Sequence, residues 1–323
     1  AVAGQDYQGL TDAEFVSPAG QLTASAVVQV RGDRVVELDE HFTLTLSDPS
    51  FGMLVNDPRV SLDKAQATLV IENDDAAILS LDNITIEEGP EGTGEDGLTP
   101  ATLTLSLKDA GGSEVSADVA VSVQLDTIDG TALGDVDYVP RLMNTATMNA
   151  GSSSLAITVD VVADALSEAD EQFRVLLSNL NVEGRDVTLD DSGGEVTIED
   201  DDPFPVISID DGTGQEPDEG TVEFVFTVRL SEPSGQPVRV QFRTVDDTAE
   251  DEQGGGDYQA KTGEVAFAPG GTMQSVRIEV NADSVSEGDE RFFVELFSAQ
   301  SGTIEMDGQR AVGTILGQDA GQA

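Results

Sequence analysis

A short acidic turn occurs three times in the chain. Its clustered carboxylates are the residues best suited to bind a ligand or to take part in a reaction. Each copy follows the pattern Asp-x3-Glu-x-Asp-Glu-x-Phe, and the copies begin at Asp33, Asp164 and Asp283. Four carboxylates within eight positions repel one another in a folded turn unless a cation or water separates them. Hard divalent cations take roughly six to eight oxygen ligands, which carboxylates on turns supply. The turns therefore suggest cation binding as the first hypothesis.

Other acidic segments recur in a constant order around the second and third turns. The second copy has Glu88 in an early turn, Asp129 in a middle turn and Asp200–Asp202 at its end. The third copy has Glu219 early and Asp246 in the middle. One turn alone offers three or four ligands, too few for a complete site. If each copy is a sandwich, alternate connections return to the same end, and these loops are expected to converge there.

The composition narrows the classes of partner. The chain has 63 acidic and 15 basic residues, with a net charge of −48, so no basic patch can neutralise the phosphates of a nucleic acid. An anionic membrane surface is disfavoured for the same reason. No apolar run approaches the roughly 18–20 residues of a spanning helix, and we expect no direct membrane insertion. Adaptation to high salt is the alternative explanation of such an acid-rich, lysine-poor chain.

The absence of cysteine excludes disulfides, thiolate metal sites and a cysteine nucleophile. The only histidine, His41, lies where the other copies have Gln172 and Arg291, so we interpret it as a surface residue rather than part of a catalytic triad. Paired carboxylates could hydrolyse glycosides. The pairs repeat in every copy, however, and the chain has no Trp to stack on a sugar. We therefore expect that the protein is not an enzyme.

Two further markers recur with the acidic turn and show that the chain is a repeat array. Each of the three Tyr residues follows an Asp, at Tyr7, Tyr138 and Tyr258, with spacings of 131 and 120 residues. The first residues of the acidic turns are 131 and 119 residues apart. Each copy closes with an apolar segment running into acids, as in Ile71–Asp75 and Ile198–Asp202. The sequence therefore predicts domains at 1–75, 76–202 and 203–323.

Apolar residues alternate with polar ones between these markers. Residues 119–125, 155–161 and 224–230 show this period of two, which is the pattern of half-buried strands. Short strands separated by Gly and Asp turns indicate an all-β fold of tandem antiparallel immunoglobulin-like β-sandwiches. The first sandwich is expected to be incomplete, because nothing in it corresponds to residues 76–131. Two explanations stay open: the fragment begins within a domain, or a neighbouring copy or another chain completes the sandwich.

These features together resemble the Calx-beta domain, the calcium-binding sandwich of sodium–calcium exchangers and of large bacterial surface proteins. The matching features are the early Glu-Gly turn, Asp-Gly-Thr-Ala before Asp-Tyr, the acidic turn and the closing Ile-x-Asp-Asp-Asp. The resemblance covers nearly the whole chain and implies Ca²⁺ as the bound ion. It implies these metal ligands: Glu88, Asp129, Asp164, Glu168, Glu171, Asp200, Asp201 and Asp202 in the second copy; Glu219, Asp246, Asp283, Glu287 and Glu290 in the third; and Asp33, Glu37, Glu40, Asp74 and Asp75 in the first.

The chain also departs from the pattern. Exchanger members carry a further acid before the turn's first Asp, where this chain has Gly32, Ala163 and Ala282, which suggests fewer ions in each site. Gly317 and Gln318 replace closing acids in the third copy, which weakens that site. A wide cage built from loops favours Ca²⁺ over Mg²⁺.

The resemblance implies a calcium-rigidified structural array in a large extracellular or cell-surface protein, such as an adhesin stalk or a filament subunit. In this interpretation, bound calcium at the loops and domain junctions offsets the repulsion of the carboxylates. The alternative is a calcium-sensing regulatory module of a transporter or signalling protein. The stalk predicts weak, extracellular-range affinity, and the sensor predicts affinity near micromolar.

Overall fold

The computed structural model describes residues 1–52, 54–55, 59–89, 97–190, 193–251, 256–282 and 288–317. Every helix or strand assigned in these residues is a β-strand, which confirms the all-β prediction. No helix in the described chain is long and apolar enough to cross a bilayer. The predicted sandwich fold follows from the period-two pattern, because alternate side chains of a strand face the core.

The chain forms two compact units. The first comprises residues 1–84, 100–160 and 172–196, and the second comprises residues 85–99, 161–171 and 197–323. The first unit thus contains the first copy and most strands of the second copy. The second unit contains the early turn at Glu88, the acidic turn and the closing acids of the second copy together with the third copy, whereas Asp129 lies in the first unit. The domain boundaries drawn from the sequence remain a prediction.

The first copy is an incomplete sandwich. Its strands are β1 (Val35–Val36), β2 (Glu40–Thr45), β3 (Ser50–Phe51), β4 (Leu54–Val55) and β5 (Gln66–Ile71). β2 and β5 form a two-stranded antiparallel sheet. In the described part of this copy, the buried apolar side chains are Val36 and Phe42, while β5 is almost wholly exposed. The described strands of this copy form only two-stranded sheets, so its core is small.

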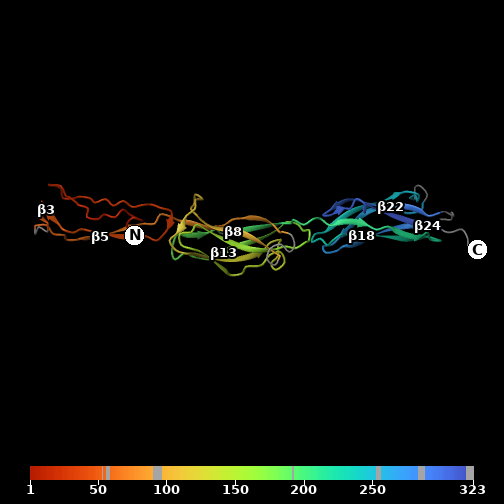
Figure 1. Ribbon diagram of the computed structural model, residues 1–323, viewed down its shortest axis with the longest axis horizontal. Helices are drawn as coiled ribbons and strands as arrows, with labels where there is room; N and C mark the ends of the chain where they lie inside the picture. Colours follow the sequence, from red (N-terminus) through yellow and green to blue (C-terminus); the bar gives the residue numbers. More distant parts are fainter. Residues whose placement is uncertain are drawn as a thin grey trace, which may run out of the picture. The chain divides into compact units, whose positions relative to one another are not determined.

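The second copy has two sheets, with β8 and β13 labelled in Figure 1. Its strands are β6 (Ala77–Leu81), β7 (Ile84–Glu87), β8 (Leu98–Lys108), β9 (Ser116–Ala117), β10 (Val121–Asp129), β11 (Asn144–Met148), β12 (Ser154–Val162), β13 (Glu171–Asn181), β14 (Val187–Leu189) and β15 (Gly194–Glu199). One sheet has the order β11-β10-β13-β15-β7 and the other β12-β8-β6-β14. Val121, Val123 and Leu125 are buried at alternate positions, as predicted.

The third copy repeats this arrangement, and β18, β22 and β24 are labelled in Figure 1. Its strands are β16 (Val206–Ile209), β17 (Gly212–Gln215), β18 (Thr221–Leu230), β19 (Val238–Asp246), β20 (Thr262–Phe267), β21 (Met273–Asn281), β22 (Glu290–Gln300), β23 (Thr303–Ile304) and β24 (Arg310–Leu316). The sheets have the orders β21-β18-β16-β23 and β17-β24-β22-β19-β20. The buried residues Phe226 and Phe292 contribute to the core of this copy.

The Phe that ends each acidic turn stacks on the Tyr of the same copy. The ring centroids of Tyr138 and Phe173 are 4.0 Å apart, and those of Tyr258 and Phe292 are 4.4 Å apart. The first copy has the same stack between Tyr7 and Phe42 at 4.1 Å. Offset or stacked aromatic pairs add stability beyond their buried area. The two sequence markers are therefore parts of one packing unit behind each acidic turn.

Candidate metal centre

The second Asp of each acidic turn has a structural role. The Asp39 carboxylate accepts a hydrogen bond from the backbone N–H of Asn73 at 3.0 Å. The matching bonds run from Asp200 N–H to Asp170 at 3.4 Å and from Gly317 N–H to Asp289 at 3.3 Å. In all three copies, the side chain of this Asp therefore links the acidic turn to the end of the closing strand by a hydrogen bond.

Sheet order brings the acidic loops of the second copy together. β15 lies next to β7, and Glu88 N–H donates a hydrogen bond to the Glu199 carbonyl at 2.9 Å. Glu88 follows β7, while Asp200 and Asp202 follow β15. One carboxylate oxygen from each of Glu88, Asp200 and Asp202 lies within 4.8 Å of the others. We call these three residues the Glu88 cluster.

The electrostatics of the Glu88 cluster favour a positive partner. Burial raises the pKa of Glu88 to about 7, and the charges of Asp164, Asp202 and Glu168 add to this rise. Burial also raises the pKa of Asp200 and of Asp202, with neighbouring carboxylates adding to both. Asp202 Oδ2 is buried and has no hydrogen-bond partner in the described chain. A divalent cation would neutralise these charges and satisfy that oxygen, so the residues present fit such an ion.

The other ligands predicted for the second copy lie on the same loops. Asp164 N–H donates to Glu88 Oε1 at 2.9 Å, and Asp164 Oδ1 accepts from Leu166 N–H at 2.7 Å. Asp201 Oδ1 accepts from Gly89 N–H at 3.1 Å, while Glu168 N–H donates to Asp200 Oδ1 at 3.0 Å. Glu171 is the first residue of β13. Asp164, Asp201 and the backbone of Glu168 therefore surround the Glu88 cluster, and their role as metal ligands stays a prediction.

Two predicted ligands have tyrosine partners that the sequence did not indicate. Asp129 Oδ1 accepts hydrogen bonds from the Tyr138 hydroxyl at 2.6 Å and from Gly134 N–H at 2.9 Å. Asp246 Oδ1 accepts from the Tyr258 hydroxyl at 2.5 Å. The Tyr138 bond, followed by the Gly134 bond, holds the pKa of Asp129 below its usual range. Burial raises the pKa of Tyr138 to about 12, with the Asp129 bond adding to the rise.

Tyr138→Phe is expected to raise the pKa of Asp129 toward its usual value, because the change removes the largest cause of its depression. A depressed folded-state pKa supplies stability above the unfolded-state pKa, and that stability is lost as pH falls through the folded-state value. The variant should lose this Asp129 contribution to stability at neutral pH. An NMR pH titration of the Asp129 carboxyl measures the shift, with Tyr258→Phe as the control. An unchanged titration in Tyr138→Phe would contradict the assignment.

The third copy places a different glutamate at the position of Glu88. Glu216 N–H donates to the Leu316 carbonyl at 3.2 Å, which mirrors the Glu88–Glu199 bond. Gly220 instead mirrors Gly97, because its carbonyl accepts from Ala282 N–H as that of Gly97 does from Ala163 N–H. The counterpart of Glu88 is therefore Glu216, although the Glu-Gly pair had indicated Glu219.

A small acidic hollow lies at this end of the third copy. Its lining comprises Glu216, Asp257, Asn281, Gly288, Glu290, Ile315 and Gly317. Glu290 was predicted as a ligand, whereas Glu216 and Asp257 were not. Gly317 stands where the second copy has Asp200, so the closing strand supplies no carboxylate at this position. The predicted ligands Asp283 and Glu287 lie outside the described residues.

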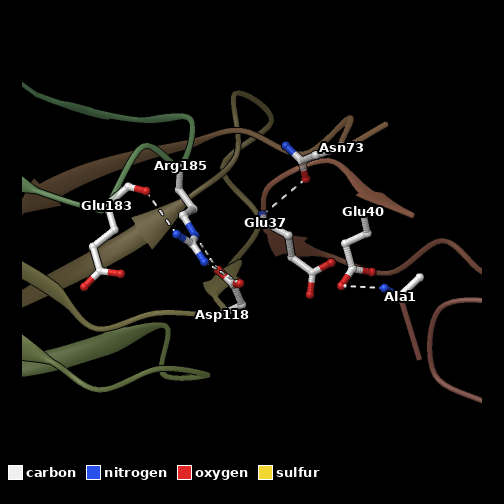
Figure 2. Close-up of polar contacts among 7 residues, drawn as sticks. All are labelled: Ala1, Glu37, Glu40, Asn73, Asp118, Glu183 and Arg185. Carbon is white, nitrogen blue, oxygen red and sulfur yellow. Dashed lines mark hydrogen bonds and ion pairs between the residues drawn. The ribbon is translucent and has the colours of Figure 1, made fainter. Parts of the chain in front are cut away.

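The predicted ligands of the first copy are held by other contacts (Figure 2). Glu37 N–H donates to Asn73 Oδ1 at 3.3 Å, and Glu40 pairs with the Ala1 ammonium at 3.4 Å. Burial, with the charges of Glu40 and Asp33 adding to it, raises the pKa of Glu37. Asn73 stands where the second copy has Asp200.

Two of the remaining first-copy acids also show interactions. Asp33 Oδ1 accepts from Val35 N–H at 3.0 Å. Burial, with the charge of Asp74 adding to it, raises the pKa of Asp75. In the part of the first copy that the structure describes, no three acidic groups converge as in the Glu88 cluster. Its ligand set stays a prediction.

Comparison with known proteins gives the family. The Calx-beta domain profile matches residues 1–75, 112–202 and 205–319. Sodium/calcium exchanger 2 of Rattus norvegicus is 32% identical over 189 residues, which is 54% of this chain and 20% of the relative. Adhesion G-protein coupled receptor V1 of Danio rerio is 31% identical over 187 residues, which is 56% of this chain and 3% of the relative. The chain thus spans about a fifth, or less, of the length of these relatives.

Solved structures with similarity to the chain include a structure named CBD12 and a bacterial adhesin. The crystal structure of CBD12 from CALX1.2 is 21% identical, with a TM-score of 0.32, and the match covers 69% of this chain and 81% of that one. A bacterial adhesin from Mobiluncus mulieris is 9% identical, with a TM-score of 0.29, and the match covers 75% of this chain and 99% of that one. The profile matches most of the sequence: the chain belongs to the Calx-beta domain family.

Proposed function

We propose that this chain is a non-catalytic, calcium-binding structural array of a large extracellular or cell-surface protein, of the adhesin-stalk or filament type. The observation that carries the proposal is the Glu88 cluster, in which three carboxylates converge and the buried Asp202 Oδ2 has no partner among the described residues. Oxygen-only ligands on loops are what Ca²⁺ prefers. Membership of the Calx-beta domain family supports the same ion.

The mechanism is electrostatic. When calcium binds, Glu88, Asp200 and Asp202 would each supply a carboxylate oxygen, and the ion's charge would offset their mutual repulsion. At 100 times its dissociation constant, an ion that binds only the folded state adds about 2.7 kcal/mol of stability. This is a large share of the roughly 5–15 kcal/mol of a typical domain. Calcium would therefore hold the acidic end of the second copy in one arrangement.

A calcium-sensing regulatory module is the second candidate, and the match to sodium/calcium exchangers favours it. The two candidates differ in affinity. A sensor needs a dissociation constant of roughly 10⁻⁷–10⁻⁵ M, whereas an extracellular module works at roughly 10⁻⁴–10⁻³ M. A measured constant in the first range would replace the structural array by the sensor as the proposed function.

Isothermal titration with calcium at fixed high ionic strength tests the site. Asp202→Asn is expected to weaken binding by roughly 10- to 100-fold, because it removes the charge and can replace a buried oxygen that has no partner among the described residues. Glu199→Gln is the matched control. Glu199 directly precedes Asp200, and the change removes one charge from an exposed side chain. Equal binding by the Asp202→Asn variant and the wild type, or equal heats with magnesium, would contradict the proposal.

A further inference from the structure

One outer face of the third copy gathers positive charge in an otherwise acidic chain. In its five-stranded sheet, the side chains that alternate with the buried ones include four arginines and two glutamates. The formal charge of this face is +2 (four minus two), although the whole chain carries −48. Four of the 15 basic residues of the chain thus lie on one side of one sheet. We call it the arginine face, and its charged residues are Arg239, Arg243, Arg291, Arg310, Glu264 and Glu295.

Two arginines of this face share one carboxylate and cover two phenylalanine rings. Arg243 and Arg310 both pair with Glu295, at 2.6 Å and 3.3 Å. The Arg310 guanidinium lies 4.5 Å from the centroid of the Phe293 ring, and the Arg243 guanidinium lies 5.4 Å from that of Phe297. The side chains of Arg243 and Arg310 are 54% and 46% exposed, whereas that of Glu295 is 15% exposed. The shared carboxylate therefore leaves one positive charge in excess at the surface.

An apolar row lies beside these arginines. The strand register places Phe293 opposite both Val245 of β19 and Val312 of β24. All three side chains are partly exposed. Aromatic residues and arginine are enriched at protein interfaces. The composition of the arginine face therefore favours a protein partner.

The second copy builds the same sheet without these arginines. The acidic turns and the matching strand registers align the two copies. Asp126 then stands where the third copy has Arg243, and Glu195 stands where it has Val312. The fold therefore does not require the arginine face, which is a surface property of the third copy alone.

The corresponding sheet of the second copy carries the opposite charge. Its outward side chains include four acids and one arginine, a formal charge of −3 (one minus four). Apolar side chains lie among them, including Ile128, which is 48% exposed. We call this surface the acidic face, and its charged residues are Glu87, Asp126, Arg174, Glu195 and Glu199.

We propose that the arginine face of one molecule docks on the acidic face of another molecule of the same chain. Both faces have the same strand order, so their rows of side chains have the same spacing. Sheets pack face to face about 10 Å apart, and salt at about 0.15 M screens charges beyond about 8 Å. The charges of the two faces therefore dominate the contact over the net charge of the rest of the chain. Because the two faces differ, the contact is heterologous, and each molecule can engage two neighbours.

Sedimentation equilibrium of the complete chain, at fixed calcium and about 0.15 M salt, tests the contact. The wild type should associate reversibly, and more weakly at about 1 M salt, where screening is stronger. Arg239→Glu/Arg243→Glu should raise the dissociation constant about tenfold or more, because it brings like charges to the acidic face. Glu195→Arg/Glu199→Arg should have the same effect from the opposite side. Each variant alone thus lacks one half of the contact.

An equimolar mixture of these two variants should associate as the wild type does. One variant keeps the natural acidic face and the other keeps the natural arginine face, so the mixture contains one complete contact. A variant that failed to fold would not restore association. Arg229→Glu/Arg277→Glu is the matched control, because these exposed arginines form ion pairs on the other sheet of the third copy. This control should leave the dissociation constant unchanged.

Two results would overturn the inference. A wild type that stays monomeric at about 100 μM would leave the arginine face to a foreign acidic partner. Association that is equally strong in the wild type and in both face variants would place the contact elsewhere. The inference goes beyond the proposed function and does not depend on it, because calcium binding is measured separately by its heat in the wild type.

Discussion

Calcium is expected to raise the melting temperature of the second copy, and the rise should be larger at pH 8 than at pH 5. In the metal-free protein, burial raises the pKa of Glu88 from 4.5 to about 7. A carboxyl whose pKa is raised on folding contributes stability that is present below its unfolded-state pKa and lost as pH rises through its folded-state value. The metal-free domain should therefore lose stability between roughly pH 4.5 and pH 7, and calcium should restore it.

The size of this effect follows from ligand linkage. At 100 times the dissociation constant, calcium adds about 2.7 kcal/mol, which shifts the melting temperature of a domain of this size by roughly 10 °C. Melts with about 5–10 mM calcium, which exceeds the roughly 10⁻⁴–10⁻³ M dissociation constants of extracellular modules, and melts with chelator measure it, both at fixed high ionic strength. Glu88→Gln should remove most of the pH dependence of the metal-free melt. If sodium or magnesium acted equally well and Asp202→Asn behaved like the wild type, the acids would be a general adaptation to high salt.

Replacing the phenylalanine that ends the third acidic turn is expected to destabilise the third copy severely. Phe292 is 0% exposed, and its ring stacks on Tyr258 at 4.4 Å and meets Phe226 edge-on at 5.8 Å. A Cβ at Gly313 would lie 2.5 Å from the ring, so the glycine leaves the space that the ring fills. Phe292→Ala should lower the free energy of unfolding by about 3–5 kcal/mol, through lost burial and the cavity left behind.

Denaturant unfolding of the complete chain, followed at the third-copy transition, measures this loss. Phe204→Ala is the matched control, because that ring is 49% exposed and its removal should change the free energy of unfolding by no more than about 0.5 kcal/mol. A loss below about 1 kcal/mol in Phe292→Ala would mean that the aromatic stack is not the anchor of this copy.

The sequence by itself determined the all-β fold and the repeat array. Alternation at Val121, Val123 and Leu125 was sufficient to predict a strand with one buried face, because side chains of a strand point to opposite sides in turn. The spacing of the Asp-Tyr pairs and acidic turns was sufficient to predict the copies, because each marker belongs to the same packing unit. That the first sandwich is incomplete, which the missing counterpart of residues 76–131 indicated, stays a prediction.

The sequence also indicated which loops carry acids, but not which acids converge. Glu88 and Asp200 are 112 residues apart, and only the neighbouring positions of β7 and β15 in one sheet bring them together. Short sequence motifs could not show whether Glu216 or Glu219 corresponds to Glu88. The answer depends on which residue follows β17 and continues its backbone hydrogen bonds to the closing strand. Nor could they show that Asp129 and Asp246 accept hydrogen bonds from tyrosines across a turn.

The contacts between the acidic turn of one copy and a loop of the next copy were likewise decided by tertiary structure. The sequence placed acidic tails at the junctions but did not indicate that loops 116–118 and 234–236 meet the preceding acidic turn. Such contacts depend on backbone groups, which leave no periodic pattern in the sequence. Local periodicity reports which face of a strand is buried, whereas a site built from several loops requires the complete strand order.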